Sequence, residues 1–310
     1  MSIGMPLLHV AGADAVSPAD IWRHWGGDPG ALISIALVAI LYGIGVRRLW
    51  KRAGKAHVVS RAAVVSFYLG ILVLLIALCS PLDAIADTLF SAHMLQHVLL
   101  IGVAAPLAIL GAPLLPLIWS LPHGARVAGG RAWNASGLRR GAPVLVMPVS
   151  AWALHAVALW TWHLPSLYAA ALASAPIHAL EHCCFYVTAL LVWWVALRPL
   201  HGRGGIGGAL FVLIATMGQC AALGAILTLS GTSWYHSQSA GAALWHLTAL
   251  EDQQLAGLIM WIPAGFVYLI AALAVLRRVF DAPETSALRR AAVTAVALVI
   301  ATSISSCKPS

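Results

Sequence analysis

Charged residues are scarce in this chain of 310 residues. Only 9% of the residues are charged, whereas 61% are hydrophobic, and the mean hydropathy is +0.89. Soluble domains carry about 25% charged residues, so this composition excludes an ordinary soluble protein. The five cysteines show neither the CxxC spacing of a metal site nor an extracellular disulfide pattern. Residues 1–29 also lack the basic start and apolar core of a signal peptide, because Asp14, Asp20 and Asp28 interrupt them.

Long apolar stretches take up most of the chain instead. A membrane-spanning helix needs about 20 mostly apolar residues. Eight segments meet this requirement, at residues 30–49, 61–79, 86–110, 143–163, 177–197, 207–229, 252–276 and 288–306. Hydroxyl side chains dilute the last segment, so seven spans with an attached tail helix are the alternative. The sequence therefore predicts an all-α, polytopic transmembrane helical bundle of seven to eight spans.

Basic residues gather on one side of these spans. Loops rich in lysine and arginine face the cytoplasm. Four alternate loops hold sixteen of the 18 basic residues, namely Arg47, Arg48, Lys51, Arg52, Lys55, Arg61, Arg126, Arg131, Arg139, Arg140, Arg198, Arg203, Arg277, Arg278, Arg289 and Arg290. The net charge of +8 is thus a topology signal, and nucleic acid is not an expected partner. We expect a single membrane domain with residues 1–29 outside, a seven-span core at 30–278, and a possible eighth span at 288–306.

Two pairs of histidines fall inside the apolar segments at helical spacing. His93 and His97 lie in SAHMLQHVLL, and His178 and His182 lie in APIHALEHCCFY. A separation of four residues places both members of a pair on one face of a helix. Ionisable groups are costly within a bilayer and mark functional sites there. Each pair is therefore a candidate to bind a metal ion.

The predicted orientation brings further polar residues to the same outer layer. His163 lies at the outer end of the fourth span, and His246 precedes the seventh. Either histidine could be a ligand or an interfacial residue beside a belt tryptophan. Glu181 and Asp252 could bind the metal, or could orient an imidazole by accepting a hydrogen bond from its other ring nitrogen.

Neighbouring side chains bear on the identity of the metal. Imidazole suits copper, zinc, iron and nickel, whereas thioether and thiolate favour Cu(I). Met94 adjoins His93, and Gln96 is a candidate partner for the second nitrogen of an imidazole. For His155, which lies deep in the fourth span, a packing role is favoured.

Two alternatives to a copper site remain open at this stage. Residues 178–182 spell HxxEH, the inverted zinc-peptidase pattern in which two histidines bind zinc and the glutamate is the general base. Such a hydrolase also needs a third ligand and a substrate groove, and no groove is identified. Histidines from two helices could also be the axial ligands of a haem in a membrane redox protein.

Four strings in order resemble the CtaG family of caa3-type cytochrome c oxidase assembly factors: SPLDAIADTLFSAHMLQHVLL, WTWHLPSLYAAAL, HALEHCCFYVTALLVWW and LEDQQLAGLIMWIPAG. The resemblance implies a polytopic protein of the bacterial inner membrane that helps a haem-copper oxidase to mature, at the copper-delivery stage and without turnover chemistry. We expect oxidase subunits and a periplasmic copper donor as partners, and the distribution of basic residues predicts a metal site towards the periplasm. The residues carried over are His93, His97, His163, His178, His182 and His246, with Glu181 and Asp252.

Overall fold

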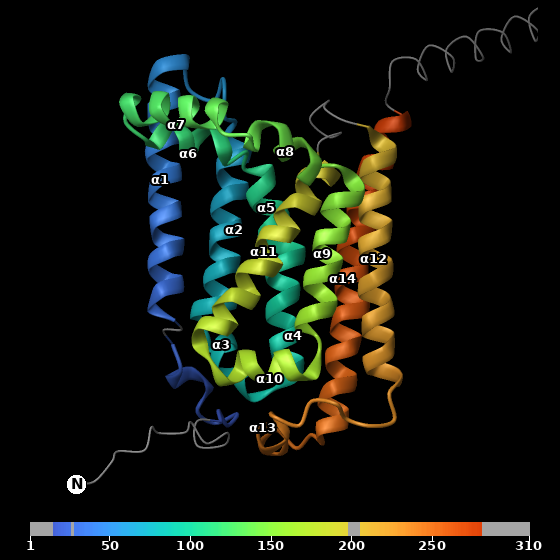
Figure 1. The fold of residues 1–310 in the computed structure, drawn as a ribbon. Helices are drawn as coiled ribbons and strands as arrows, with labels where there is room; N and C mark the ends of the chain where they lie inside the picture. The colour runs from blue at the N-terminus through green and yellow to red at the C-terminus, as the bar shows by residue number, and fades with distance from the viewer. Residues whose placement is uncertain (1–14, 26–27, 198–204, 281–310) are drawn as a thin grey trace, which may run out of the picture.

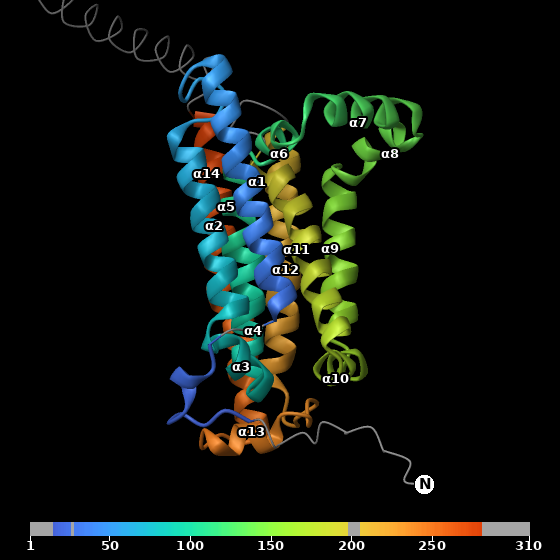
Figure 2. The same ribbon diagram turned by 90° about the vertical axis from the view of Figure 1, so that its left-hand side faces the viewer.

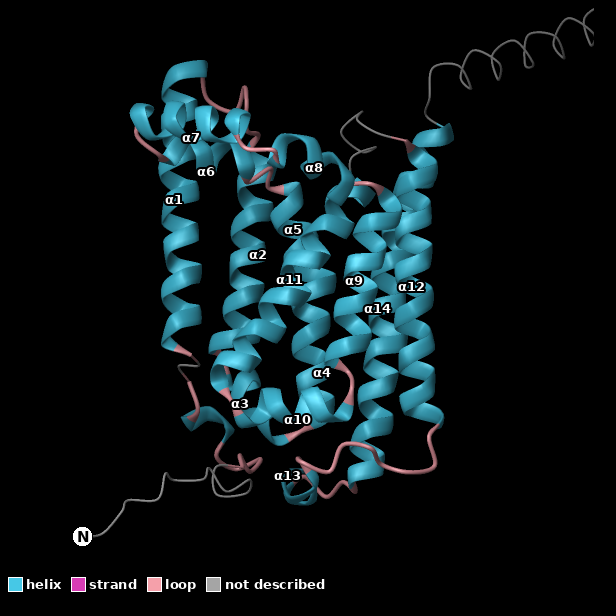
Figure 3. Ribbon diagram, in the orientation of Figure 1, coloured by secondary structure: helices cyan, strands magenta, loops and turns pink. Residues whose placement is uncertain are grey.

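The computed structural model describes residues 15–25, 28–197 and 205–280. Long helices run roughly parallel to one another and form a bundle (Figure 1). Within the described ranges there is no β-strand (Figure 3). The predicted all-α bundle is therefore confirmed, and its apolar helices are those of a multi-pass membrane protein.

Six helical segments are long and apolar enough to cross a membrane. They are α1 (Pro29–Ala53), α2 (Arg61–Cys79), the segment Phe90–Leu110, α11 (Ala175–Leu197), α12 (Ile206–Leu229) and α14 (Ala249–Phe280). A seventh span results if α8 (Leu138–Leu145) and α9 (Pro148–Trp162) are counted together, although they are bent by 73°. The bend lies just before Pro148, the first residue of α9. The predicted eighth span at 288–306 falls outside the described residues.

The third span begins later than predicted, at residue 90 instead of 86. Residues 81–88 form a separate short helix, α3 (Pro81–Thr88), and Leu89 is extended with φ −124°. The span itself has three pieces: α4 (Phe90–Val98), the π-helical turn η2 (Leu99–Ala104) and α5 (Ala105–Leu110). A proline ring clashes with the carbonyl four residues earlier, and the wide turn directly before Pro106 relieves that clash.

Shorter helices close the two ends of the bundle. α3, α10 (Pro165–Ala173) and α13 (Ser239–Leu244) lie at one end, which we call the histidine end (Figure 1). At the other end lie α6 (Leu114–Ser120), α7 (His123–Ala135) and α8, and α7 and α8 project to one side (Figure 2). We call this the basic end, because it carries the arginines of α7 and α8 and the basic last turns of α1. Residues 111–142, which connect the third and fourth predicted spans, are mainly helical.

Close contacts between spans set the core. α12 and α14 approach at Gly224 and Gly257, where a Cβ on either residue would lie 2.7 or 2.6 Å from the other's carbonyl oxygen. Small residues of this kind let transmembrane backbones pack directly. On α11, the buried Trp193 donates a hydrogen bond of 2.8 Å to the carbonyl of Ile101, inside the π turn. This bond ties α11 to the third span, and these two helices carry the histidine pairs.

Candidate metal site

α4 and α11 bring the two histidine pairs together near the histidine end. Within the pairs, the ring centroids of His93 and His97 are 4.4 Å apart, and those of His178 and His182 are 4.3 Å apart. Across the pairs, the His93 ring is stacked 5.1 Å from the His178 ring, and the His97 and His182 rings are 5.3 Å apart. The four rings therefore contact one another as one group.

Glu181 lies within this group and is only 1% exposed. Its Oε2 is 3.6 Å from Nε2 of His93, and its Oε1 is 3.8 Å from Nε2 of His97. Two overlapping sets have ligand atoms within 4.8 Å of one another: His93, His97 and His182, and then His93, His178 and Glu181. We call the four histidines and Glu181 the histidine cluster.

Several buried nitrogens of the cluster lack hydrogen-bond partners in the part of the chain that the structure describes. In all four histidines Nε2 is buried, and none has a hydrogen-bond partner among the described residues. A buried polar atom without a partner costs about 1–3 kcal/mol. Zinc–imidazole bonds are about 2.0–2.1 Å long, so side chains set this far apart would move inward slightly to share one ion. The donor set therefore fits a small cation, which would satisfy several of these atoms at once.

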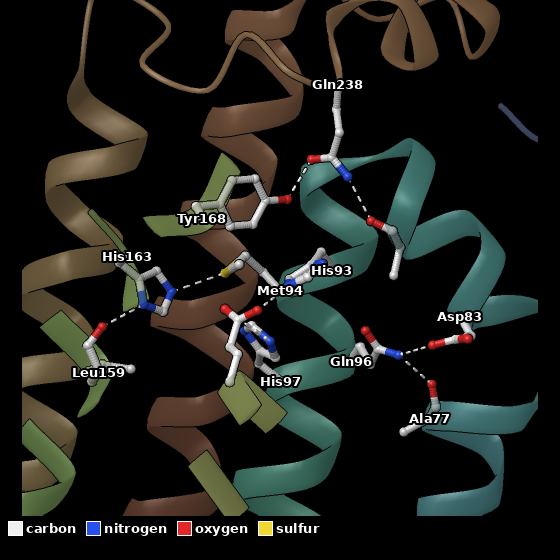
Figure 4. Close-up of polar contacts among 12 residues, drawn as sticks. Ala77, Asp83, His93, Met94, Gln96, His97, Leu159, His163, Tyr168 and Gln238 are labelled. Carbon is white, nitrogen blue, oxygen red and sulfur yellow. Dashed lines mark hydrogen bonds and ion pairs between the residues drawn. The ribbon is translucent and has the colours of Figure 1, made fainter. Parts of the chain in front are cut away.

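His163 joins the cluster from the end of α9. Its ring lies 6.2 Å from that of His97, and its Nδ1 is 2.7 Å from the carbonyl oxygen of Leu159. Its Nε2 lies 3.2 Å from the sulfur of Met94, a fully buried residue on α4 (Figure 4). Met94 is thus placed between His163 and the cluster.

Two other candidate residues lie outside the cluster. His246 is exposed, with a left-handed backbone (φ 58°) just before α14. Asp252 is 2% exposed, and its carboxylate accepts hydrogen bonds from the backbone N–H groups of Phe90 (2.7 Å) and Ser91 (3.0 Å). It therefore caps the first turn of α4, the helix that carries His93 and His97.

Gln96 braces α4 against its neighbours. Its Nε2 donates to the carbonyl of Ala77 and to Oδ1 of Asp83, both at 2.7 Å (Figure 4). Burial raises the pKa of the Asp83 carboxyl to about 6, and the hydrogen bond from Gln96 partly opposes that rise. Gln96 thus bonds to α2 and α3, and among the described residues it makes no hydrogen bond to an imidazole. His155 pairs with Thr188 (Nδ1 to Oγ1, 2.9 Å) in the core, as a packing residue does.

Three residues that the sequence did not single out cover the cluster at the histidine end. Tyr168 packs edge-on against His93 at 5.1 Å, and its hydroxyl donates to Oε1 of Gln238 at 2.5 Å (Figure 4). Gln238 in turn donates to the carbonyl of Ala86 at 2.7 Å. The Tyr235 hydroxyl donates to the carbonyl of His163 at 2.6 Å. We call Tyr168, Tyr235 and Gln238 the roof. Of the three, only Tyr168 lies in one of the four strings quoted from the sequence, and no local sequence pattern marks it as a site residue.

The packing of the cluster bears on the two alternatives. The rings contact one another and Phe185, whose centroid is 4.6 Å from that of His97, so a small ion suits the site better than a porphyrin. A zinc hydrolase needs its glutamate to meet a water and a substrate. Glu181 is instead buried among the histidines, which favours binding of an ion over hydrolysis.

Comparison with known proteins agrees with the strings quoted from the sequence. A family model described as cytochrome c oxidase caa3 assembly factor matches residues 40–282. The match includes the whole histidine cluster, the roof and the π-helical turn η2. No curated protein and no solved structure matches the chain. Because the family model covers well over half of the sequence, the chain belongs to the family of caa3-type cytochrome c oxidase assembly factors.

Proposed function

We propose that this protein binds copper in the histidine cluster and delivers it to a haem-copper oxidase while that enzyme is assembled. The observation that carries the proposal is the group of four histidines in contact around Glu181, in which each Nε2 is buried and has no hydrogen-bond partner among the described residues. Membership of the oxidase assembly family gives the destination of the metal. Copper is the cargo, and holding it requires no turnover by this chain.

The ligand types support copper over other metals. Imidazole binds copper and zinc alike, whereas a thioether favours Cu(I). Met94 is fully buried and in contact with His163 at the edge of the cluster. A caa3-type oxidase is a haem-copper enzyme, so copper is also the cargo that its assembly requires.

The charge distribution supports delivery on the periplasmic side of a bacterial inner membrane. The basic end of the bundle is opposite the histidine end (Figures 1 and 2). Loops rich in arginine and lysine stay in the cytoplasm. The histidine end then faces the periplasm, where a copper donor and the oxidase subunits would meet the cluster.

Copper titration of the full-length protein in detergent tests this proposal. Wild type is expected to bind copper stoichiometrically, and the double variant His93→Ala with His182→Ala is expected to lose that binding. Undiminished binding by the double variant would show that the cluster is not the site. The matched control is His246→Asn, which removes an exposed imidazole at the same end. In cells, the double variant should lower the copper content of the oxidase.

A further inference from the structure

The ring of His163 has a defined tautomer. Its Nδ1 is 2.7 Å from the carbonyl oxygen of Leu159, and a carbonyl can only accept a hydrogen bond. Nδ1 therefore carries the hydrogen. In a neutral imidazole the other nitrogen, Nε2, is then an acceptor with a free lone pair.

That lone pair faces a second acceptor. Nε2 of His163 is 3.2 Å from the thioether sulfur of Met94, and a thioether has no hydrogen to donate. His163 is 6% exposed and Met94 is fully buried, so no bulk water mediates this contact. A hydrogen bond here would require an imidazolium ion, and burying a charge away from water is costly. A soft cation held by both atoms would satisfy both at once.

We infer that Met94 and His163 form a soft metal subsite that binds Cu(I) beside the histidine cluster. The subsite rests on the proposed function for its metal. It adds the oxidation state of the copper and a second position for the ion beside the cluster. One nitrogen and one sulfur, both uncharged, are a ligand pair that selects Cu(I) over Zn(II). The imidazoles and carboxylate of the cluster accept either metal.

His97 connects the subsite to the cluster. It lies three residues after Met94 on α4, on the same helix face, and its ring is 6.2 Å from that of His163. Its Nε2 faces Glu181 at 3.8 Å, and its Nδ1 is buried without a partner among the described residues. His97 therefore has one nitrogen beside Glu181 and a second, unpartnered nitrogen that is available to an ion. An ion passes between the cluster and the subsite by exchanging one ligand for the next, and its oxidation state does not change.

Metal binding by full-length protein under anaerobic conditions tests the subsite. Cu(I) is supplied in a competing chelator, and Zn(II) is titrated separately. Met94→Leu keeps the volume of the side chain and removes the sulfur, so folding should be retained. It is expected to weaken Cu(I) binding about tenfold or more while Zn(II) binding stays at the wild-type level. Met260→Leu, at another buried methionine, is the matched control and should bind both metals as wild type does.

X-ray absorption of the copper-loaded protein gives an independent readout. Wild type and Met260→Leu should show a sulfur neighbour at about 2.3 Å, the usual length of a metal–sulfur bond. Met94→Leu should lose it. A wild-type spectrum with nitrogen and oxygen neighbours alone, or unchanged Cu(I) affinity in Met94→Leu, would overturn the subsite.

The two proposals fail in different ways. Copper bound with nitrogen ligands only, and lost in His93→Ala with His182→Ala, supports the cluster and overturns the subsite. Copper that keeps its sulfur neighbour and its wild-type amount in that double variant supports the subsite and overturns the cluster as the site. A wild-type protein that binds no Cu(I) would overturn both.

Discussion

At the scale of single residues, the neighbours of an unpartnered nitrogen separate a packing histidine from a candidate ligand. His155 is as buried as His93, and its Nε2 also lacks a partner among the described residues, but its Nδ1 meets the hydroxyl of Thr188 and it belongs to neither set of close ligand atoms. His93 and its three companions contact one another, and the Nε2 of each has no hydrogen-bond partner among the described residues. Hydrogen bonding satisfies most buried polar groups in proteins, so this exception calls for a ligand.

Glu181→Gln should weaken metal binding while leaving the fold intact. Glutamine keeps the size of the side chain but removes the negative charge that lies 3.6 and 3.8 Å from two histidine nitrogens. Substitution of groups around a metal costs about 10–100-fold in affinity, and we expect a loss in that range. Copper affinity measured against a chelator checks it. Glu251→Gln, at an exposed glutamate, is the control, and equal affinity in both variants would mean that Glu181 takes no part.

His246→Asn should bind copper as wild type does. The histidine is exposed and lies outside both sets of close ligand atoms. Asparagine tolerates the left-handed backbone at this position, where φ is 58°. Copper stoichiometry and affinity are the measurements. A clear loss of binding would bring the loop before α14 into the site.

At the scale of helices, Asp252 holds the start of α4 from another span. Replacing it with alanine leaves the N–H groups of Phe90 and Ser91 without their acceptor. Loss of a helix cap typically costs about 0.5–2 kcal/mol, and we expect Asp252→Ala to lower the free energy of unfolding by that order. Thermal unfolding in detergent measures it. Asp252→Asn keeps one acceptor oxygen and should lose less; an equal loss would argue against capping.

Trp193→Phe tests the bond between α11 and the π turn. Phenylalanine preserves the stacking on Tyr268, where the ring centroids are 5.3 Å apart, but it cannot donate to the carbonyl of Ile101. A buried acceptor left without its donor costs about 1–3 kcal/mol. Unfolding temperature should fall, and copper affinity should fall with it if the bond aligns the two histidine helices. Trp160→Phe, at a side chain that is 41% exposed, should change neither the unfolding temperature nor the copper affinity.

At the scale of the whole molecule, the two ends should face opposite sides of the membrane. A cysteine at Ser237, exposed in the loop of the histidine end, should react with an impermeant thiol reagent in cells with a permeable outer membrane. A cysteine at Val58, exposed between α1 and α2 at the basic end, should react only after the inner membrane is opened. The signal is taken above the wild-type background. The reverse pattern would place the cluster on the cytoplasmic side.

Much of this arrangement was predictable from sequence. Apolar length located the spans, and the four-residue spacing of His93–His97 and His178–His182 placed each pair on one helix face. The predicted start of the third span was wrong because Leu89 adopts an extended backbone that breaks the helix, and an apolar leucine gives no sign of that break in the sequence. The Asp252 cap and the contact between Met94 and His163 could not be predicted, since each joins residues from different helices. Such pairs depend on which spans pack together, and local pattern does not encode that.

The roof affects how quickly metal could leave the cluster. Tyr168, Tyr235 and Gln238 are joined by hydrogen bonds to α3 and to the end of α9, and only His178 and His182 of the cluster keep partial exposure. An ion bound behind the roof would exchange slowly with free chelator even at moderate affinity. Its residence time, and not its equilibrium constant, would then govern delivery. Docking of an acceptor protein that displaces the roof could trigger release. Loss of copper to the surroundings would then stay rare while no acceptor is bound.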